Sequence, residues 1–151
     1  MFKAGITHKV DKITHHGYHR FYDMFLIPLR NENINFLEIG VDKGRSLRTW
    51  TDFFKSAKIY GLDINEGYDH PRGKIYKGDQ SDIRVLEILV QKIGKCKIII
   101  DDGSHVPEHQ LLGFNYLFNN CLDYGGVYII EDIETSYWGE INKKANFMDI
   151  M

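Results

Sequence analysis

The stretch Ile98–His105, with the sequence IIIDDGSH, passes from three consecutive isoleucines directly to two carboxylates and an imidazole. A short, continuous run of β-branched residues is typical of a strand that is buried on both faces, as in a parallel sheet covered by helices. Glycine and serine directly after the acids indicate that the strand ends in a turn. The stretch therefore predicts a buried strand that delivers Asp101, Asp102 and His105 to one edge of a sheet.

Further strands and helices alternate on either side of this stretch. Short apolar runs predict strands over residues 36–39, 59–64, 75–76, 97–100 and 127–130. Helical periodicity between them predicts helices over residues 45–55, 82–93 and 108–118, and a helix over 17–29 that is interrupted near Pro28. The alternation predicts an α/β fold with a mostly parallel sheet and helices on both faces. The connection from Ile64 to Lys74 is short for a parallel crossover, so we expect at most one helical turn there.

Length and composition describe an ordinary globular domain. The chain has 151 residues, 43% of them hydrophobic, and a formal net charge of −2. This length suits one domain, and the lack of a Lys/Arg block gives no reason to expect a nucleic acid or an anionic membrane as partner. No apolar run approaches a membrane span, and the N-terminus shows no signal-peptide pattern, so we expect a cytoplasmic protein. We interpret Cys96 and Cys121 as reduced thiols.

Acidic residues follow all five predicted strands. They belong to the segments Glu38–Ser46, Asp63, Gly78–Asp82, Asp101–His105 and Glu131–Glu134. Acids are common in loops and in the first turns of helices, so a single instance would carry little weight. Ligands of open α/β sheets bind beyond the carboxyl ends of the strands. The repeated pattern therefore predicts a functional site at this edge.

The first of these loops restricts the cofactor. Its glycines, Gly40 and Gly44, have the spacing G-x-x-x-G, and no dinucleotide or phosphate-loop motif occurs in the chain. Glu38 would repel a phosphate and would suit a cationic ligand, while Asp63 at the end of the next strand can accept both hydroxyls of a ribose. A positively charged nucleoside without phosphate satisfies these conditions, and S-adenosylmethionine is such a molecule.

Several segments together resemble a known family. These are FLEIGVDKGRSLRTW (36–50), IYGLDI (59–64), GDQSD (78–82), IIIDDGSH (98–105) and GGVYIIEDIETSYW (125–138). They resemble the class I S-adenosylmethionine-dependent methyltransferases, and most of all the metal-dependent macrolide-sugar O-methyltransferases, with cephalosporin hydroxylase-like proteins as relatives. The resemblance runs from about Asp11 to Trp138. It implies a Rossmann-like sheet with strand order 3-2-1-4-5, a single domain with an N-terminal helical segment (1–33), a cofactor-binding core (34–138) and a tail (139–151).

The resemblance also implies roles for individual residues. It makes Asp102, Glu131 and Asp132 ligands of Mg²⁺ and His105 the catalytic base, with Asp102 also part of the catalytic group. The residues implied in cofactor binding are Glu38, Gly40, Gly44, Ser46, Asp63, Asp79, Gln80, Ser81 and Asp101. Three clustered carboxylates repel one another unless a cation joins them, and oxygen ligands favour a hard divalent ion. A metal lowers the pKa of a bound hydroxyl, and a histidine can then take its proton.

Some residues keep two interpretations. His105 and His109 are four apart on a predicted helix that Ser104 would cap, a spacing that also occurs in zinc sites. His15, His16 and His19 form either a surface cluster or a segment that closes over the cofactor. Tyr137–Trp138 could line a sugar pocket or pack in the core.

Three functions remain open at the level of sequence. The first is O-methylation of a sugar hydroxyl in a glycoside or nucleotide sugar; the second is a metal-dependent hydroxylase or hydrolase on the same carboxylates; the third is a non-catalytic cofactor-binding or assembly subunit. A full methyltransferase domain has two more strands after the fifth, and no strand pattern follows Ile130. Because an uncovered edge strand invites pairing, we expect a homo-oligomer.

Overall fold

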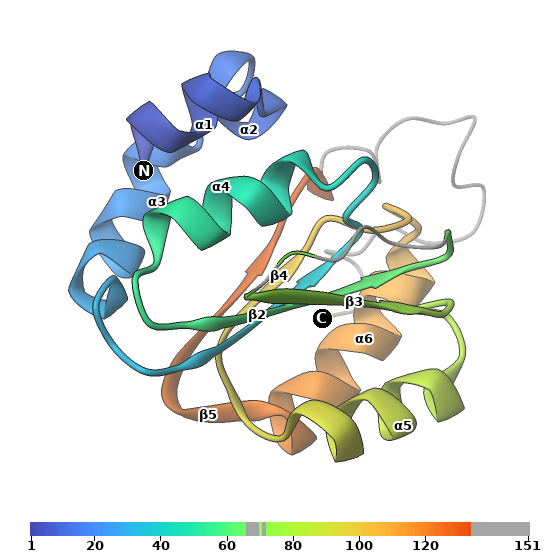
Figure 1. Cartoon of the computed structure of the whole chain (residues 1–151). Coiled ribbons are helices and arrows are strands. Elements are labelled where there is room, and N and C mark those ends of the chain that lie inside the picture. Colours follow the sequence, from blue (N-terminus) through green and yellow to red (C-terminus); the bar gives the residue numbers. More distant parts are fainter. Residues whose placement is uncertain (66–69, 71, 134–151) are drawn as a thin grey trace.

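Five parallel strands form the centre of the molecule (Figure 1). The computed structural model describes residues 1–65, 70 and 72–133 of the chain. Within them the sheet has the order β3-β2-β1-β4-β5, and every pairing is parallel. The strands are β1 (Asn35–Ile39), β2 (Lys58–Asp63), β3 (Gly73–Lys77), β4 (Cys96–Asp101) and β5 (Leu122–Ile130). The predicted strand order and the predicted parallel sheet are confirmed.

Helices cover both faces of this sheet, as the sequence predicts (Figure 1). On one side lie α1 (Phe2–His8), α2 (Asp11–Thr14), α3 (His19–Leu26), the 3-10 turn η1 (Ile27–Leu29) and α4 (Arg45–Phe53). On the other side lie α5 (Ile83–Ile93) and α6 (Pro107–Asn120). Successive side chains of β4 point to opposite faces, so Ile98 and Ile100 pack with Trp50 of α4, whereas Ile99 packs with Leu89 and Leu117. Burial on both faces explains why the strand reads as an unbroken apolar run.

Of the boundaries that differ from the sequence prediction, two have a clear cause. β5 begins at Leu122, five residues before the predicted start, because Gly125 and Gly126 interrupt the apolar pattern without ending the strand. α6 begins at Pro107 with Val106 as its N-cap, so the prediction that Ser104 caps a helix starting at His105 is wrong. Proline suits the first helical position because its missing N–H has no partner to lose there.

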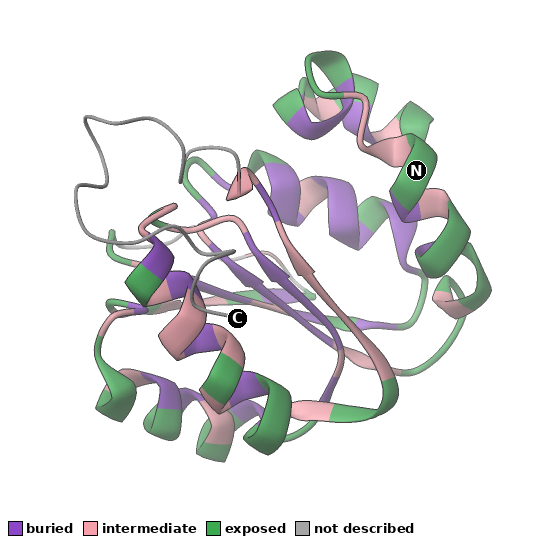
Figure 2. Ribbon diagram, turned by 180° about the vertical axis from the view of Figure 1, so that it is seen from behind, coloured by how far each residue is buried: buried purple, intermediate pink, exposed green. Residues whose placement is uncertain are grey.

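The remaining expectations concern the sheet edges and the thiols. The short connection between β2 and β3 does lead to a parallel pairing, although residues 66–69 and 71 lie outside the described part. Figure 2 shows that the central strands are buried, while Val127–Ile130 of the edge strand β5 are of intermediate burial. Cys96 and Cys121 are buried and unbridged, as expected. No helix among the described residues is both long and apolar enough to cross a membrane.

Candidate active site

The carboxyl ends of the strands surround a cavity of about 450 Å³. Because all strands run in the same direction, the loops that follow them meet at one edge, and this volume suits a small organic ligand. Of the residues implied by the resemblance, its wall contains Gly40, Ser46, Asp63, Asp79, Gln80, Asp102, His105 and Asp132. The chain segment Lys9–Lys12, between α1 and α2, forms a further part of the wall.

Five other predicted residues are not in the wall: Glu38, Gly44, Ser81, Asp101 and Glu131. The carboxylate of Glu38 is fully buried, accepts a hydrogen bond of 2.7 Å from Ser46 Oγ, and lies 3.6 Å from the Lys12 ammonium. Burial raises the pKa of Glu38, which Lys12 and Ser46 partly counteract. In this structure the cation that faces Glu38 is therefore Lys12 of the chain itself, and a contact between Glu38 and a cationic ligand stays a prediction.

The glycine loop after β1 is shaped by the chain rather than by a ligand. Gly40 has φ +79°, and a Cβ atom at this position would lie 2.0 Å from the carbonyl oxygen of Asp102. Glycine is needed here because the loops after β1 and β4 touch through their backbones. Gly44 has φ 72° and forms the N-cap of α4. The spacing of the two glycines therefore has a structural cause in addition to any role in ligand binding.

Asp63 at the end of β2 holds the same loop in place. Its Oδ2 accepts hydrogen bonds of 2.9 Å from the backbone N–H groups of Val41 and Asp42, and its Oδ1 accepts one of 2.8 Å from Asn65. Partial burial would raise the pKa of this carboxyl, but the three backbone donors outweigh burial and lower it. The lowered pKa keeps Asp63 ionised in the cavity wall at neutral pH.

Asp101 lies beneath the cavity and supports its floor. It is completely buried, and it accepts hydrogen bonds from Gly103 N–H at 3.2 Å and from the Gln80 side chain at 3.2 Å. Burial raises its pKa to about 7, although both donors oppose this shift. Gln80 also accepts a hydrogen bond of 2.8 Å from Ser104 N–H. Asp101 thus holds the turn between β4 and α6, and of the two adjacent acids only Asp102 reaches the cavity.

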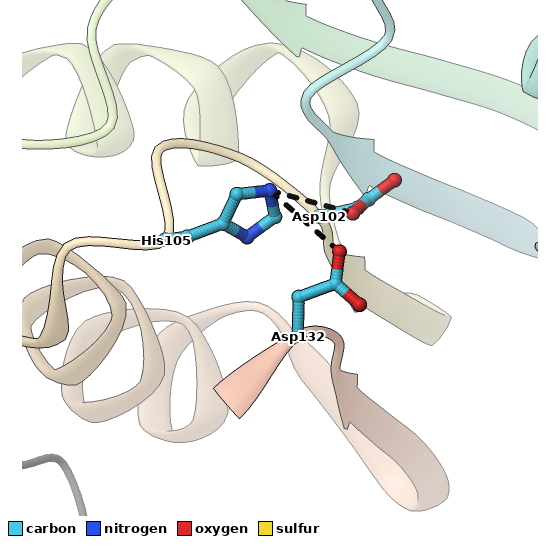
Figure 3. A group of neighbouring side chains, drawn as sticks. All are labelled: Asp102, His105 and Asp132. Carbon is cyan, nitrogen blue, oxygen red and sulfur yellow. Dashed lines mark ion pairs between the residues drawn. The ribbon is translucent and has the colours of Figure 1, made fainter. Parts of the chain in front are cut away.

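Three side chains of the cavity wall converge: Asp102, His105 and Asp132 (Figure 3). His105 Nε2 lies 3.9 Å from Asp102 Oδ1 and 3.9 Å from Asp132 Oδ2. One ligand atom from each residue lies within 4.8 Å of the others, which is a spacing that a metal ion can join. His105 and Asp132 have φ values of 54°, in the left-handed region, so the turns direct both side chains to the site.

Glu131 lies next to this group on the buried side, where a lysine contacts it. The Lys12 ammonium is 2.9 Å from Glu131 Oε1 and also contacts Asp102 Oδ2, and Tyr22 donates a hydrogen bond to Glu131. Burial raises the pKa of Glu131 to about 8, which Lys12 and Tyr22 partly counteract. The structure brings Asp102, Asp132 and His105 together, and it joins Glu131 to the same cluster through Lys12.

Sequence reasoning missed the contribution of the N-terminal helices to the site. Burial lowers the pKa of Lys12, but the carboxylates of Glu38, Glu131 and Asp102 outweigh it, and the net shift is upward. Tyr18 donates a hydrogen bond of 2.8 Å to Asp132. No spacing rule connects these residues to acids more than 80 positions away. The available signal was the resemblance, which begins at about Asp11 and so includes this segment.

The structure bears on the two interpretations that the sequence left open for the histidines. His105 precedes α6, so it does not share a helical face with His109, and Ser104 Oγ contacts His109 Nδ1 at 3.0 Å. The metal-capable group found in the described part of the chain includes His105 but not His109, so the helical i, i+4 arrangement on which the zinc alternative depends is absent from these residues. His15 and His16 are exposed, whereas His19 is half-buried and its ring centroid lies 4.9 Å from that of Phe2, so the surface cluster is only partly confirmed. Tyr137, Trp138 and the predicted tail lie outside the described residues.

The strand order of the sheet is shared with solved methyltransferase structures, and these identify the fold class of the chain. A methyltransferase of the mycinamycin pathway, in complex with Mg, SAH and mycinamycin VI, superposes with a TM-score of 0.90 at 34% identity over 98% of this chain and 43% of its own. A ribosomal RNA methyltransferase from Plasmodium falciparum shares the fold alone, with a TM-score of 0.63 at 18% identity over 87% of this chain and 84% of its own. The chain therefore has the Rossmann-like fold of the class I methyltransferases.

Sequence relatives narrow the class to a particular group. The chain is 38% identical over 142 residues to an 8-demethyl-8-alpha-L-rhamnosyl tetracenomycin-C 2'-O-methyltransferase from Streptomyces olivaceus, and 39% identical over 140 residues to the mycinamicin VI 2''-O-methyltransferase from Micromonospora griseorubida. These alignments include 88% and 87% of this chain, but only 37% and 35% of the relatives. No family model matches. The chain is homologous to these antibiotic-pathway sugar O-methyltransferases, which confirms the resemblance inferred from the sequence.

Proposed function

We propose that the chain is an S-adenosylmethionine-dependent, Mg²⁺-dependent O-methyltransferase that acts on a sugar hydroxyl of a glycoside. The observation that carries this proposal is the convergence of Asp102, His105 and Asp132 in the wall of the cavity. Homology to sugar O-methyltransferases supports it, and so does the Mg and SAH in the solved neighbours. The same relatives favour methyl transfer over the hydroxylase, hydrolase and non-catalytic alternatives.

The wall residues provide the contacts that the cofactor requires. The ionised Asp63 can accept the ribose hydroxyls, and its bonds to Val41 and Asp42 keep the glycine loop in position for the same ligand. Asp79 and Gln80 approach the cavity from the loop after β3. Glu38 and Asp101 support this wall from below, so we propose that they act through Ser46 and Gln80 rather than by direct contact.

The group Asp102, His105 and Asp132, hereafter the outer cluster, offers carboxylate oxygens that fit Mg²⁺. Two partly exposed carboxylates of the cavity wall leave coordination positions for water and substrate, as this ion prefers. Asp102 and Asp132 would hold the metal. Glu131 is the third ligand that the resemblance implies, and in this structure its Oε1 contacts Lys12 and Tyr22. When bound, the metal supplies positive charge that lowers the pKa of a neighbouring substrate hydroxyl.

His105 is the proposed base. Its ring is 30% exposed and lies in the cavity wall, where a sugar hydroxyl could approach it. Taking the hydroxyl proton would convert the imidazole to imidazolium, whose Nε2 lies 3.9 Å from one oxygen of Asp102 and 3.9 Å from one oxygen of Asp132. In the proposed transfer the deprotonated oxygen would form a bond to the methyl carbon of S-adenosylmethionine as the carbon–sulfur bond breaks and S-adenosylhomocysteine leaves. The protein would have to hold the oxygen, methyl group and sulfur in line.

A radiolabel assay tests this proposal directly. The chain is incubated with methyl-labelled S-adenosylmethionine and a panel of glycosides with free sugar hydroxyls, with and without chelator. We expect label in at least one glycoside, loss of transfer with chelator, and recovery with added Mg²⁺. Calorimetry with S-adenosylmethionine provides the second measurement: absence of binding at millimolar ligand would refute the methyltransferase assignment.

Two further expectations belong to this proposal. We propose a cytoplasmic location, in keeping with the homology to sugar O-methyltransferases. We also propose a homo-oligomer, because β5 lies at the edge of the sheet that the described residues form and its Val127–Ile130 are of intermediate burial. Light scattering coupled to size-exclusion chromatography measures the oligomeric state. A purely monomeric species at micromolar concentration would contradict that expectation.

A further inference from the structure

The two oxygens of Asp102 have different partners. Oδ2 contacts the Lys12 ammonium of the N-terminal segment, whereas Oδ1 faces His105 Nε2 at 3.9 Å. Lys12 is only 2% exposed, so water does not screen this contact as it would at the surface. The contact with Lys12 therefore favours an orientation of the Asp102 carboxylate in which the other oxygen faces His105.

Asp132 shows the same division. Its Oδ1 accepts a hydrogen bond of 2.8 Å from Tyr18 OH, and its Oδ2 faces His105 Nε2 at 3.9 Å. Tyr18 comes from the same N-terminal segment as Lys12 but from a different turn of chain, immediately before α3. Each aspartate is thus held on one oxygen by a residue of this segment. The other oxygen of each faces His105 (Figure 3).

The buried acids behind them also depend on this segment. Lys12 lies 2.9 Å from Glu131 and 3.6 Å from Glu38, and Tyr22 donates to Glu131. Glu38, Asp102 and Glu131 lie at the ends of three different strands, so one ammonium connects β1, β4 and β5. Buried carboxylates without a counter-charge are strongly unfavourable. Lys12 is therefore a permanent counter-charge for the cluster.

We propose that Tyr18 and Lys12 are positioning residues of the metal centre: each fixes one carboxylate oxygen of a metal-binding aspartate so that the other oxygen faces the ion. Groups that orient metal ligands in this way commonly change metal affinity when they are removed. The inference rests on the proposed metal-dependent function. It goes beyond that function because it assigns a role to the N-terminal helices, which would otherwise only cover one face of the sheet.

Tyr18→Phe tests the proposal with the smallest change. The variant loses only the hydroxyl that bonds to Asp132, so we expect Mn²⁺ affinity, measured by electron paramagnetic resonance without substrate, to fall about 10–100-fold. The midpoint of urea unfolding without metal should change little. Tyr124→Phe is the matched control, because Tyr124 is 96% exposed on β5, and it should bind Mn²⁺ like the wild type.

Lys12→Met provides the second arm. The substitution removes the ammonium that holds the Asp102 carboxylate but keeps much of the apolar volume, so we expect lower stability without metal and a smaller stabilisation by Mg²⁺ than in the wild type. Lys3→Met, at an exposed position of α1, is the control and should respond to Mg²⁺ like the wild type. If Lys12→Met does not fold even with Mg²⁺, the result for Tyr18→Phe decides the proposal.

The outcomes separate this inference from the proposed function. If wild type and Tyr18→Phe bind Mn²⁺ equally well, the positioning role is refuted and the metal site stands. If the wild type binds no Mn²⁺, the metal-dependent function is refuted together with this inference. Loss of affinity in Tyr18→Phe with an unchanged unfolding midpoint supports both.

Discussion

Asp63→Asn is the most informative substitution in the cavity wall, because the carboxylate holds the glycine loop and faces the proposed ribose site. Asparagine can still accept the hydrogen bonds from Val41 and Asp42, but as a neutral acceptor, and its amide N–H₂ group would oppose the N–H of Asn65. One bond is lost and two are weakened. With partial solvent exposure taken into account, we expect a loss of about 1–2 kcal/mol in the free energy of unfolding.

The effect of Asp63→Asn on the free energy of unfolding should depend on pH in a defined direction. The folded-state pKa of Asp63 is lowered, so its stabilising contribution is present above the unfolded pKa and is lost as the pH falls through the folded value. The difference in unfolding free energy between wild type and Asp63→Asn should therefore be complete at neutral pH and should shrink below about pH 4. Urea unfolding at a series of pH values measures it.

Cofactor binding supplies a second measurement of the same substitution. Loss of a charged acceptor for the ribose hydroxyls should weaken S-adenosylmethionine binding by about 10–100-fold in calorimetry. Asp42→Asn is the control for stability: it makes the same charge change in the same loop, and asparagine tolerates the left-handed conformation there, with φ 46°. The reasoning is refuted if Asp63→Asn and Asp42→Asn unfold alike at neutral pH and Asp63→Asn binds the cofactor like the wild type.

Three further substitutions test other parts of the site and fold. Gly40→Ala places a Cβ atom 2.0 Å from a backbone oxygen at a positive φ, so urea unfolding should show a loss of about 2–4 kcal/mol, and a loss below 0.5 kcal/mol would contradict the close contact. His105→Asn should lower the rate of methyl transfer about 10²–10⁴-fold while the unfolding midpoint stays near the wild-type value; an unchanged rate would exclude His105 as the base. Asp82→Ala removes the side-chain cap that accepts from Arg84 N–H at the start of α5, which should cost about 1 kcal/mol in thermal or urea unfolding without changing cofactor affinity.

The fold was largely predictable from local patterns. Ile98–Ile100 is buried on both faces of a parallel sheet, and that environment produces a continuous apolar run that sequence alone reveals. Strand β5 was predicted only in part, because Gly125–Gly126 interrupts the apolar pattern of its first half. The start of α6 was placed two residues too early because Ser104 resembles a cap, whereas Ser104 Oγ contacts His109 in the structure.

The sequence by itself determined which acids stand at the ends of the strands, and hence that Asp102, His105 and Asp132 meet at one edge. That result follows from a local rule, since parallel strands bring their carboxyl ends together whatever the intervening chain. Only the tertiary structure decided which acids face the cavity and which lie beneath it, and that Lys12 and Tyr18 hold them. Lys12 is 119 positions from Glu131, and no periodicity encodes a contact over that distance. It arises because burying several carboxylates requires a counter-charge, which the folded N-terminal helices bring to them.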